Sequence, residues 1–190
     1  VFSMLATIAN AEKYGVRFDV VDDLTGPRLG RPKSATFRTA DVVGLDTFAH
    51  VVKTMQDTLP EDPWHPLFKT PDWLARLIAD GALGQKTRRG IYKKEGKQTF
   101  VLDPLKGEYV EGGQNGDEAV KAILKEADPA VKFKKLRESQ HPQAQFLWAC
   151  FRDVFHYISY HLADIADNAR DLDLAIRWGF GWSTGPFETW

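Results

Sequence analysis

The sequence contains a single cysteine, no long apolar run and almost no excess of charge of either sign. Cys150 is the only cysteine among 190 residues, so no disulfide can form within the chain. We interpret Cys150 as a small packed residue of an apolar helix. No apolar run is long enough to span a bilayer, and no signal-peptide pattern opens the chain. The net charge of −1 argues against broad electrostatic binding to nucleic acid or to an anionic membrane. We therefore expect a cytoplasmic protein that binds no nucleic acid and spans no membrane.

Helical periodicity dominates what the chain does contain. Hydrophobic residues make up 43% and charged residues 27%, which is ordinary for a globular domain. Apolar residues recur at helical spacing in residues 1–14 and 142–165, and the first stretch closes on Gly15. Shorter helices are predicted to begin near Asp19, Ser34, Asp46, Pro71, Asp117, Pro129 and Asn168. Ser34 and Asp46 are predicted as helix caps. The chain is therefore predicted to be mainly α-helical.

Residues 84–110 differ from the rest. Three short β-prone runs, at 90–92, 99–102 and 108–110, lie between turn residues. They predict a small β-hairpin rather than a sheet that could form a core. The next segment, Glu111-Gly-Gly-Gln-Asn-Gly116, has the composition of a flexible linker.

The end of the chain repeats a pattern from its beginning. Each time a long apolar helix is followed by a charged joint, a short helix, a Gly/Pro loop and a phenylalanine. The short helices are predicted to end at Gly26 and Gly179, which are 153 positions apart. Such self-similarity indicates one packing solution used twice, related by a pseudo-twofold axis. The motif positions, interpreted as structural, are Gly26, Gly30, Pro32, Phe37 and Asp41 in the first copy and Gly179, Gly185, Pro186 and Phe187 in the second.

Three segments carry a family resemblance. They are GPRLGRPKSATFRTADVVGLD (26–46), GQKTRRGIY (84–92) and DLDLAIRWGFGWSTGPF (171–187). All three resemble the C-terminal domain of 3-hydroxyacyl-CoA dehydrogenases, although Ile91 replaces the usual Phe. Two tandem copies are similar to the long multifunctional β-oxidation proteins. The resemblance implies a first C-terminal domain at 1–110, a linker with helices at 111–140 and a second, truncated copy at 141–190.

The resemblance also implies what this chain does not do. Family members oxidise an L-3-hydroxyacyl-CoA with NAD, and an N-terminal Rossmann domain carries the cofactor and the acid/base pair. We therefore expect no catalytic, cofactor-binding or metal-binding residue here, and no activity from this chain alone. Val1 and Trp190 resemble cuts inside structured regions, so we expect an excised piece. The implied partners are its own Rossmann domain, the acyl-CoA substrate, a fused enoyl-CoA hydratase domain and a second copy in a homodimer.

One basic cluster is a candidate contact site. Arg28, Arg31, Lys33 and Arg38 lie close together in the sequence. They could contact CoA phosphates or the missing domain. A solvated loop is the alternative interpretation.

Two other patterns imitate known sites. Gly181-Trp-Ser-Thr-Gly185 fits the hydrolase G-x-S-x-G motif, but a helix precedes it and no histidine follows. We interpret Ser183 as a loop residue. His156 and His161 are five positions apart, a spacing that does not place two ligands on one helix face. We interpret them as solvated or packed side chains.

Two further functions stay open at this stage. One is a non-catalytic dimerisation or scaffold module. The other is the C-terminal module of a related NAD-dependent hydroxyacid dehydrogenase, which shares the helical architecture.

Overall fold

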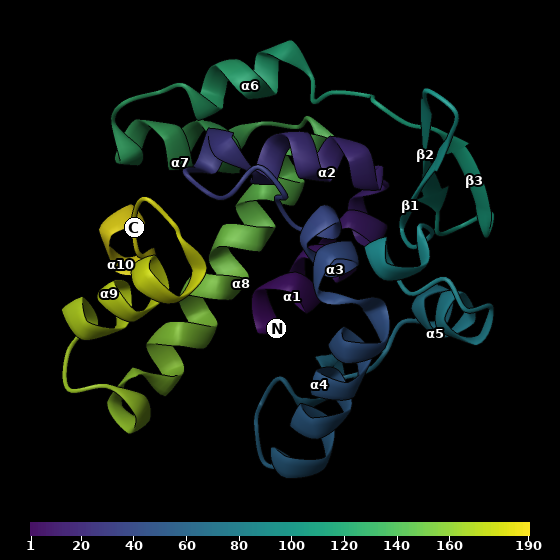
Figure 1. The fold of residues 1–190 in the computed structure, drawn as a ribbon. Helices are drawn as coiled ribbons and strands as arrows, with labels where there is room; N and C mark the ends of the chain where they lie inside the picture. Colours follow the sequence, from purple (N-terminus) through teal and green to yellow (C-terminus); the bar gives the residue numbers. More distant parts are fainter.

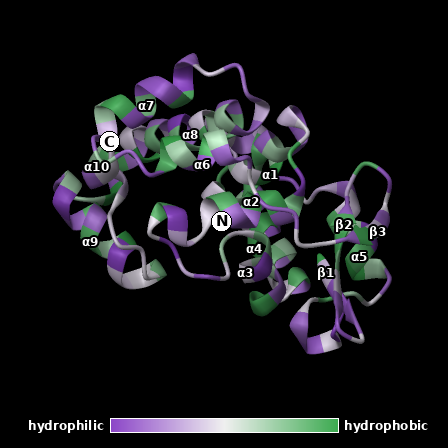
Figure 2. Ribbon diagram, turned by 90° about the horizontal axis from the view of Figure 1, so that it is seen from above, coloured by the Kyte–Doolittle hydropathy of each residue, from purple (hydrophilic) through white to green (hydrophobic).

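The computed structural model describes all residues 1–190 and is built around two long helices. α1 (Phe2–Tyr14) packs along α8 (Pro142–Ile165), and this is the most extensive contact between any two elements (Figure 1). The ring of Phe2 stacks on Tyr157 with centroids 3.7 Å apart. Hydrophobic residues gather where α1, α2 and α8 meet, as Figure 2 shows from above. Burial of this apolar surface is the main force that holds the fold together.

The remaining elements surround this pair. A small sheet and α5 lie to one side of it, and α9 and α10 lie to the other (Figure 1). None of the helices combines the length and the hydropathy needed to cross a membrane. In chain order the other elements are α2 (Phe18–Thr25), η1 (Pro27–Leu29), α3 (Phe37–Val43), α4 (Leu45–Thr58), η2 (His65–Leu67), α5 (Asp72–Ala79), η3 (Gln85–Thr87), β1 (Tyr92–Glu95), β2 (Gln98–Asp103), β3 (Glu108–Glu111), α6 (Glu118–Leu124), α7 (Pro129–Glu138), α9 (Ala169–Phe180) and α10 (Pro186–Thr189).

The predicted mainly α-helical fold is confirmed, and several helix ends follow local chemistry. Gly15 ends α1 in the left-handed conformation, with φ of 63°. Pro142 occupies the first turn of α8, where a missing N–H costs nothing. The side chain of Asn168 accepts a hydrogen bond from the amide of Asp171 and so caps α9.

The predicted hairpin is present as β1 and β2, and β3 extends it to a three-stranded antiparallel sheet in the order β1-β2-β3. Tyr92 pairs with Val101, and Val101 pairs with Val110. The sheet also contributes to the core, since Val101 and Leu102 are buried and β2 contacts α2. Packing against a helix stabilises strands that would be too short to stand alone.

Two predicted caps are wrong. Ser34 makes no capping hydrogen bond to α3, whose first amides are bound instead by a side chain of α2. Asp46 lies inside the first turn of α4, where its carboxylate pairs with Lys86 at 2.6 Å. In each case a residue far along the sequence decides the local environment.

The last predicted helix extends beyond its expected end. α9 continues through Gly179 to Phe180, and Gly181 is the residue that ends it in the left-handed conformation. Gly26 follows α2 with φ of −91° and is not equivalent to Gly179. The predicted repeat spacing of 153 is therefore wrong. Trp178, near the end of α9, is 79% exposed.

The structure instead relates the two ends of the chain at a spacing of 151. α8 ends 151 positions after α1 (165 minus 14), and α9 begins 151 positions after α2 (169 minus 18). Gly30 and Gly181 have the same spacing, and their φ values are 65° and 66°. α9 therefore corresponds to α2 and η1 together, since the sequence Gly26-Pro27 interrupts the first of the two helices.

Candidate functional site

The joint between α2 and α3 is organised by one buried carboxylate. Oδ1 of Asp22 accepts hydrogen bonds from the backbone amides of Thr36 and Phe37, at 3.0 and 2.7 Å. Oδ2 accepts from the amide of Arg38 at 3.0 Å and from the hydroxyl of Tyr92 at 2.8 Å. Asp22 thus caps α3 from another helix and ties the sheet to the same point.

Burial is the main cause of the pKa shifts of Asp22 and of the Tyr92 hydroxyl. Burial raises the pKa of Asp22 to about 6, although the four hydrogen bonds to its carboxylate lower it in part. Burial and the neighbouring Asp22 carboxylate both raise the pKa of the Tyr92 hydroxyl above its usual value. Both oxygens of Asp22 are occupied by donors of this chain, so the residue acts as a structural clamp.

A second buried carboxylate, that of Asp41, holds the segment 84–92 in place. Asp41 accepts hydrogen bonds from the amides of Ile91 and Tyr92, at 2.8 and 2.9 Å. Gly84 and Gly90 pack so closely against Asp41 that a Cβ at either position would overlap it. The glycines and the aspartate of the motif therefore form one contact between α3 and the start of the sheet.

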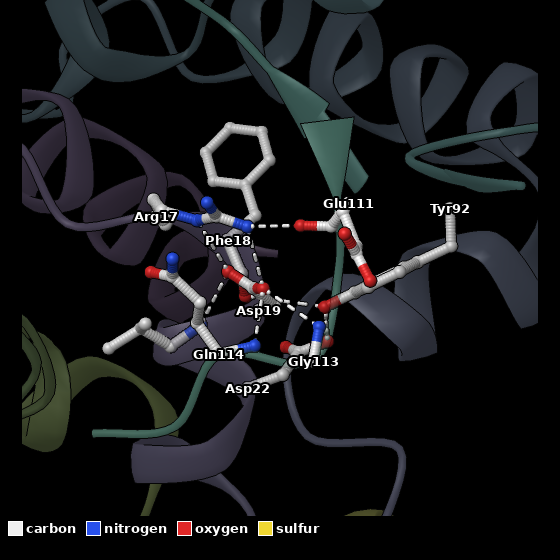
Figure 3. Close-up of polar contacts among 9 residues, drawn as sticks. Arg17, Phe18, Asp19, Asp22, Tyr92, Glu111, Gly113 and Gln114 are labelled. Carbon is white, nitrogen blue, oxygen red and sulfur yellow. Dashed lines mark hydrogen bonds and ion pairs between the residues drawn. The ribbon is translucent and has the colours of Figure 1, made fainter. Parts of the chain in front are cut away.

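The glycine-rich segment 111–116 is fixed by a third carboxylate, as Figure 3 shows. Oδ2 of Asp19 accepts from the amides of Gly113 and Gln114, at 3.0 and 2.9 Å, and also pairs with Arg17. The same arginine donates to the carbonyl of Glu111 at 2.7 Å. Composition alone predicted a flexible linker, and it gave no sign of these bonds.

The C-terminal part of the chain contains a similar clamp. Asp173 of α9 accepts from the amides of Phe187 and Glu188, both at 2.8 Å. Gly185 packs against Asp173 with no room for a Cβ, and Pro186 begins α10. Asp173 lies 151 positions after Asp22, which is the spacing of the helices.

The two motif loops contact each other. The amide of Ser183 donates to the carbonyl of Gly30 at 2.8 Å, and a Cβ at Gly30 would overlap the Ser183 hydroxyl. The guanidinium of Arg31 lies 4.0 Å above the ring of Trp182. Arg31 and Trp182 are themselves 151 positions apart, and each directly follows a glycine in the left-handed conformation.

The basic cluster is divided between two places. Arg28, Lys33 and Arg38 line one polar cavity of about 490 Å³, together with Asp19, Asp22 and Asp23. Arg28 pairs with Asp23 at 3.1 Å, and Arg38 lies 4.1 Å above the ring of Tyr92. Lys33 has no ion pair in the structure. Arg31 lines two other cavities, and Arg28 also lines one of them, so no single cavity is lined by all four residues.

An apolar groove of about 340 Å³ opens beside the first turn of α1. Its walls come from α1, the loop 31–36, α3 and α4, and Phe180 and Trp182 from the C-terminal part of the chain also line it. Val43 and Val51 are exposed at its edge. Apolar clefts with a few hydroxyl groups are typical binding sites for small molecules.

The patterns that imitate other sites have structural explanations. Ser183 lies in the loop between α9 and α10, against Gly30. Nε2 of His161 lies 3.0 Å from Asp62, within a cluster of aromatic rings around Trp64. No group of three or more His, Cys, Asp or Glu side chains is arranged to hold a metal ion.

Comparison with known proteins gives consistent results. Residues 2–94 match the family model for the 3-hydroxyacyl-CoA dehydrogenase C-terminal domain. A probable 3-hydroxyacyl-CoA dehydrogenase of Bacillus subtilis is 39% identical over 189 residues, which are 100% of this chain and 24% of that protein. A protein of the same description from Deinococcus radiodurans is 42% identical over 94 residues, 50% of this chain and 26% of that protein. A putative fatty acid oxidation complex trifunctional enzyme of Rickettsia felis is 22% identical over 90% of this chain and 23% of its own length. The chain thus spans about a quarter of the length of the curated relatives it matches.

Proposed function

Because residues 2–94 belong to the 3-hydroxyacyl-CoA dehydrogenase C-terminal domain family, we propose that this chain is the substrate-cleft and pseudodimerisation part of a longer NAD-dependent L-3-hydroxyacyl-CoA dehydrogenase. In this proposal the longer protein acts in fatty acid β-oxidation. The observation that carries it is the agreement between the family match and the buried contacts of Asp22 and Asp41. Those contacts account for the conformation of both motif segments in residues 26–92.

The proposal includes a duplication. Residues 1–110 are the first C-terminal domain, 111–140 a linker with helices and 141–190 a second, truncated copy. The common spacing of 151, the paired clamps at Asp22 and Asp173 and the packing of α1 on α8 support this division. The two copies take the places that two subunits occupy in a symmetric dimer.

The cofactor belongs to another part of the longer protein in this account. A dinucleotide site needs a parallel βαβ unit whose helix N-terminus holds the pyrophosphate. The strands here form an antiparallel sheet with short turns, so these residues do not fit NAD. A nucleotide-binding domain before α1 would supply NAD and the residues that move the substrate proton.

What this chain supplies is a surface for the substrate. The apolar groove beside α1 provides one wall of the acyl-CoA cleft, and hydroxyl groups such as that of Thr39 lie along it. Arg28, Lys33 and Arg38 are candidate contacts for the CoA phosphates or for the nucleotide-binding domain. The fragment alone then lacks the groups that carry out the oxidation and is inactive.

A fused second enzyme is a further part of the proposal. The Rickettsia relatives are described as trifunctional enzymes of a fatty acid oxidation complex. An enoyl-CoA hydratase domain on the same polypeptide would supply the 3-hydroxyacyl-CoA that the dehydrogenase oxidises.

The substrate class can be tested with the longer protein. NADH formation is followed with L-3-hydroxybutyryl-CoA and, in parallel, with free L-3-hydroxybutyrate and L-lactate. We expect oxidation of the CoA thioester and no measurable oxidation of the two free acids. Oxidation of a free hydroxyacid in preference to the thioester would instead assign the protein to a related hydroxyacid dehydrogenase.

A further inference from the structure

A second cavity, of about 270 Å³, lies on the other side of the contact between the two motif loops. It is enclosed by the η1–Gly30 loop, the first turn of α7, one face of α8 and the loop before α10. Arg31 and Trp182 line both this cavity and the apolar groove. This position makes the cavity the second-copy counterpart of the groove, since Phe155 here lies 151 positions after Met4 there.

The counterpart differs from the groove in its charge. Arg31 packs flat against Trp182 and makes no ion pair and no side-chain hydrogen bond in this structure. Burial lowers the pKa of its guanidinium to about 10, which leaves it charged at neutral pH. Arg31 is half-buried, so its unpaired charge is only partly solvated, and a counter-anion would stabilise it.

A second cation faces the same space. Lys132, in the first turn of α7, is half-buried, lines the cavity and has no ion pair. The one carboxylate in the lining, Glu188, is already bound to Arg177 at 3.0 Å and to the amide of Gly185. Arg28 is neutralised by Asp23. The cavity therefore presents two free cations and no free anion.

The remaining wall is aromatic. Phe133 lies edge-on to Phe155, with ring centroids 5.7 Å apart, and both rings line the cavity. Trp182 closes the opposite side beneath Arg31. Aromatic walls favour a flat apolar body, and Arg with Lys favours a phosphate or carboxylate group.

We propose that this cavity binds a small amphipathic anion, with Arg31 and Lys132 holding its phosphate or carboxylate and the aromatic side chains enclosing its flat apolar part. The site lies next to the proposed acyl-CoA groove, with which it shares Arg31 and Trp182, and it uses no cofactor. Its ligand can bind whether or not the longer protein is a 3-hydroxyacyl-CoA dehydrogenase, so the two proposals are tested independently.

Calorimetric titration of residues 1–190 tests the proposal with four probes. Phenyl phosphate and benzoate each combine an aromatic ring with an anion, whereas phenol has only the ring and inorganic phosphate only the charge. We expect saturable one-to-one binding of at least one of the first two, and binding at least tenfold weaker for phenol and for inorganic phosphate. The proposal is overturned if neither aromatic anion binds, or if phenol or inorganic phosphate binds as tightly as they do.

Variants then locate the site. Lys132→Gln removes one cation from a partly exposed position and should weaken the aromatic anion about tenfold, the usual effect of losing one charge-assisted hydrogen bond. Arg31→Gln should weaken it at least as much. Lys134→Gln, on an exposed part of the same helix, is the control and should leave the affinity unchanged. Unchanged affinity in Lys132→Gln, with a melting temperature equal to that of the parent, would rule the cavity out.

Discussion

The amide of Ser183 donates a 2.8 Å hydrogen bond to the carbonyl of Gly30 and so joins the two motif loops. The counterpart of this contact under the 151 spacing is Gly181 against Pro32, where a Cβ would stand 3.9 Å from the proline ring. Arg31, stacked on Trp182, joins the same two loops. The proposed duplication would make these contacts an isologous interface within one polypeptide.

Gly30→Ala tests this interface. The residue is left-handed, with φ of 65°, and its Cβ would overlap the Ser183 hydroxyl. We expect a loss of about 3 kcal/mol in the free energy of unfolding, of which the backbone strain is about 1 kcal/mol. Urea denaturation followed by circular dichroism measures it.

Gly15→Ala is the matched control for that substitution. Gly15 has nearly the same φ, 63°, but nothing lies within 4 Å of its added Cβ. Gly15→Ala should therefore lose only the part of the unfolding free energy that comes from backbone strain, about 1 kcal/mol. Adding Ser183→Gly to Gly30→Ala should restore part of the stability that Gly30→Ala loses beyond the backbone strain. Equal losses at the two glycines, with no rescue, would mean that the loops do not press on each other in solution.

Asp41→Asn tests the clamp that holds the 84–92 segment. The aspartate accepts two amide hydrogen bonds in a buried position, and an asparagine offers one acceptor oxygen and places an N–H against the other donor. We expect a loss of about 2–3 kcal/mol of stability. Asp46→Asn, which alters an exposed pair with Lys86, should change the unfolding midpoint little. A larger loss of stability in Asp46→Asn than in Asp41→Asn would contradict the role of Asp41 as the clamp of this segment.

The raised pKa of Asp22 predicts a pH dependence of stability. Its folded value of about 6 lies above the unfolded value, so the folded state binds the proton more tightly. The stability that Asp22 gains by binding this proton is fully present below about pH 4 and is lost as the pH rises through 6. Compared with Asp22→Asn, the parent protein should lose about 3 kcal/mol between these limits. A difference that is flat, or that grows with pH, would show that the hydrogen bonds outweigh burial.

Cys150 should be unreactive in the folded protein. Burial raises the pKa of its thiol to about 12, so almost no thiolate exists at pH 8. We expect its reaction with an aromatic disulfide reagent to be roughly a hundredfold slower than that of a free cysteine. In urea, the same reagent should react with one thiol per chain at the rate of a free cysteine. Fast reaction under native conditions would place Cys150 at the surface.

Much of the helical framework could be predicted from the sequence because its signals are local. Gly15 ends α1, Pro142 begins α8 and Asn168 caps α9 through residues next to the helix itself. The order of motif segments likewise predicted the family. Periodicity and capping residues act over a few positions, which is the range that a single sequence reveals.

The rest depended on contacts between distant residues. Asp22 caps α3 from 15 positions away and Asp41 binds amides 50 positions away, so neither role has a local signal. The third strand pairs with β2, which in turn packs on α2. Arg31 does not line the cavity of Lys33 and Arg38, although Arg28 lines both that cavity and one that Arg31 lines, and the spacing of these residues in the sequence does not reveal this.

The most direct test of the account is an assay of NADH formation from L-3-hydroxybutyryl-CoA, with residues 1–190 and the longer protein measured side by side. The account places the substrate wall and the paired copies in this chain and the oxidation chemistry in the domain before it. It predicts turnover by the longer protein and none above background by residues 1–190. NAD-dependent turnover by residues 1–190 alone would contradict it.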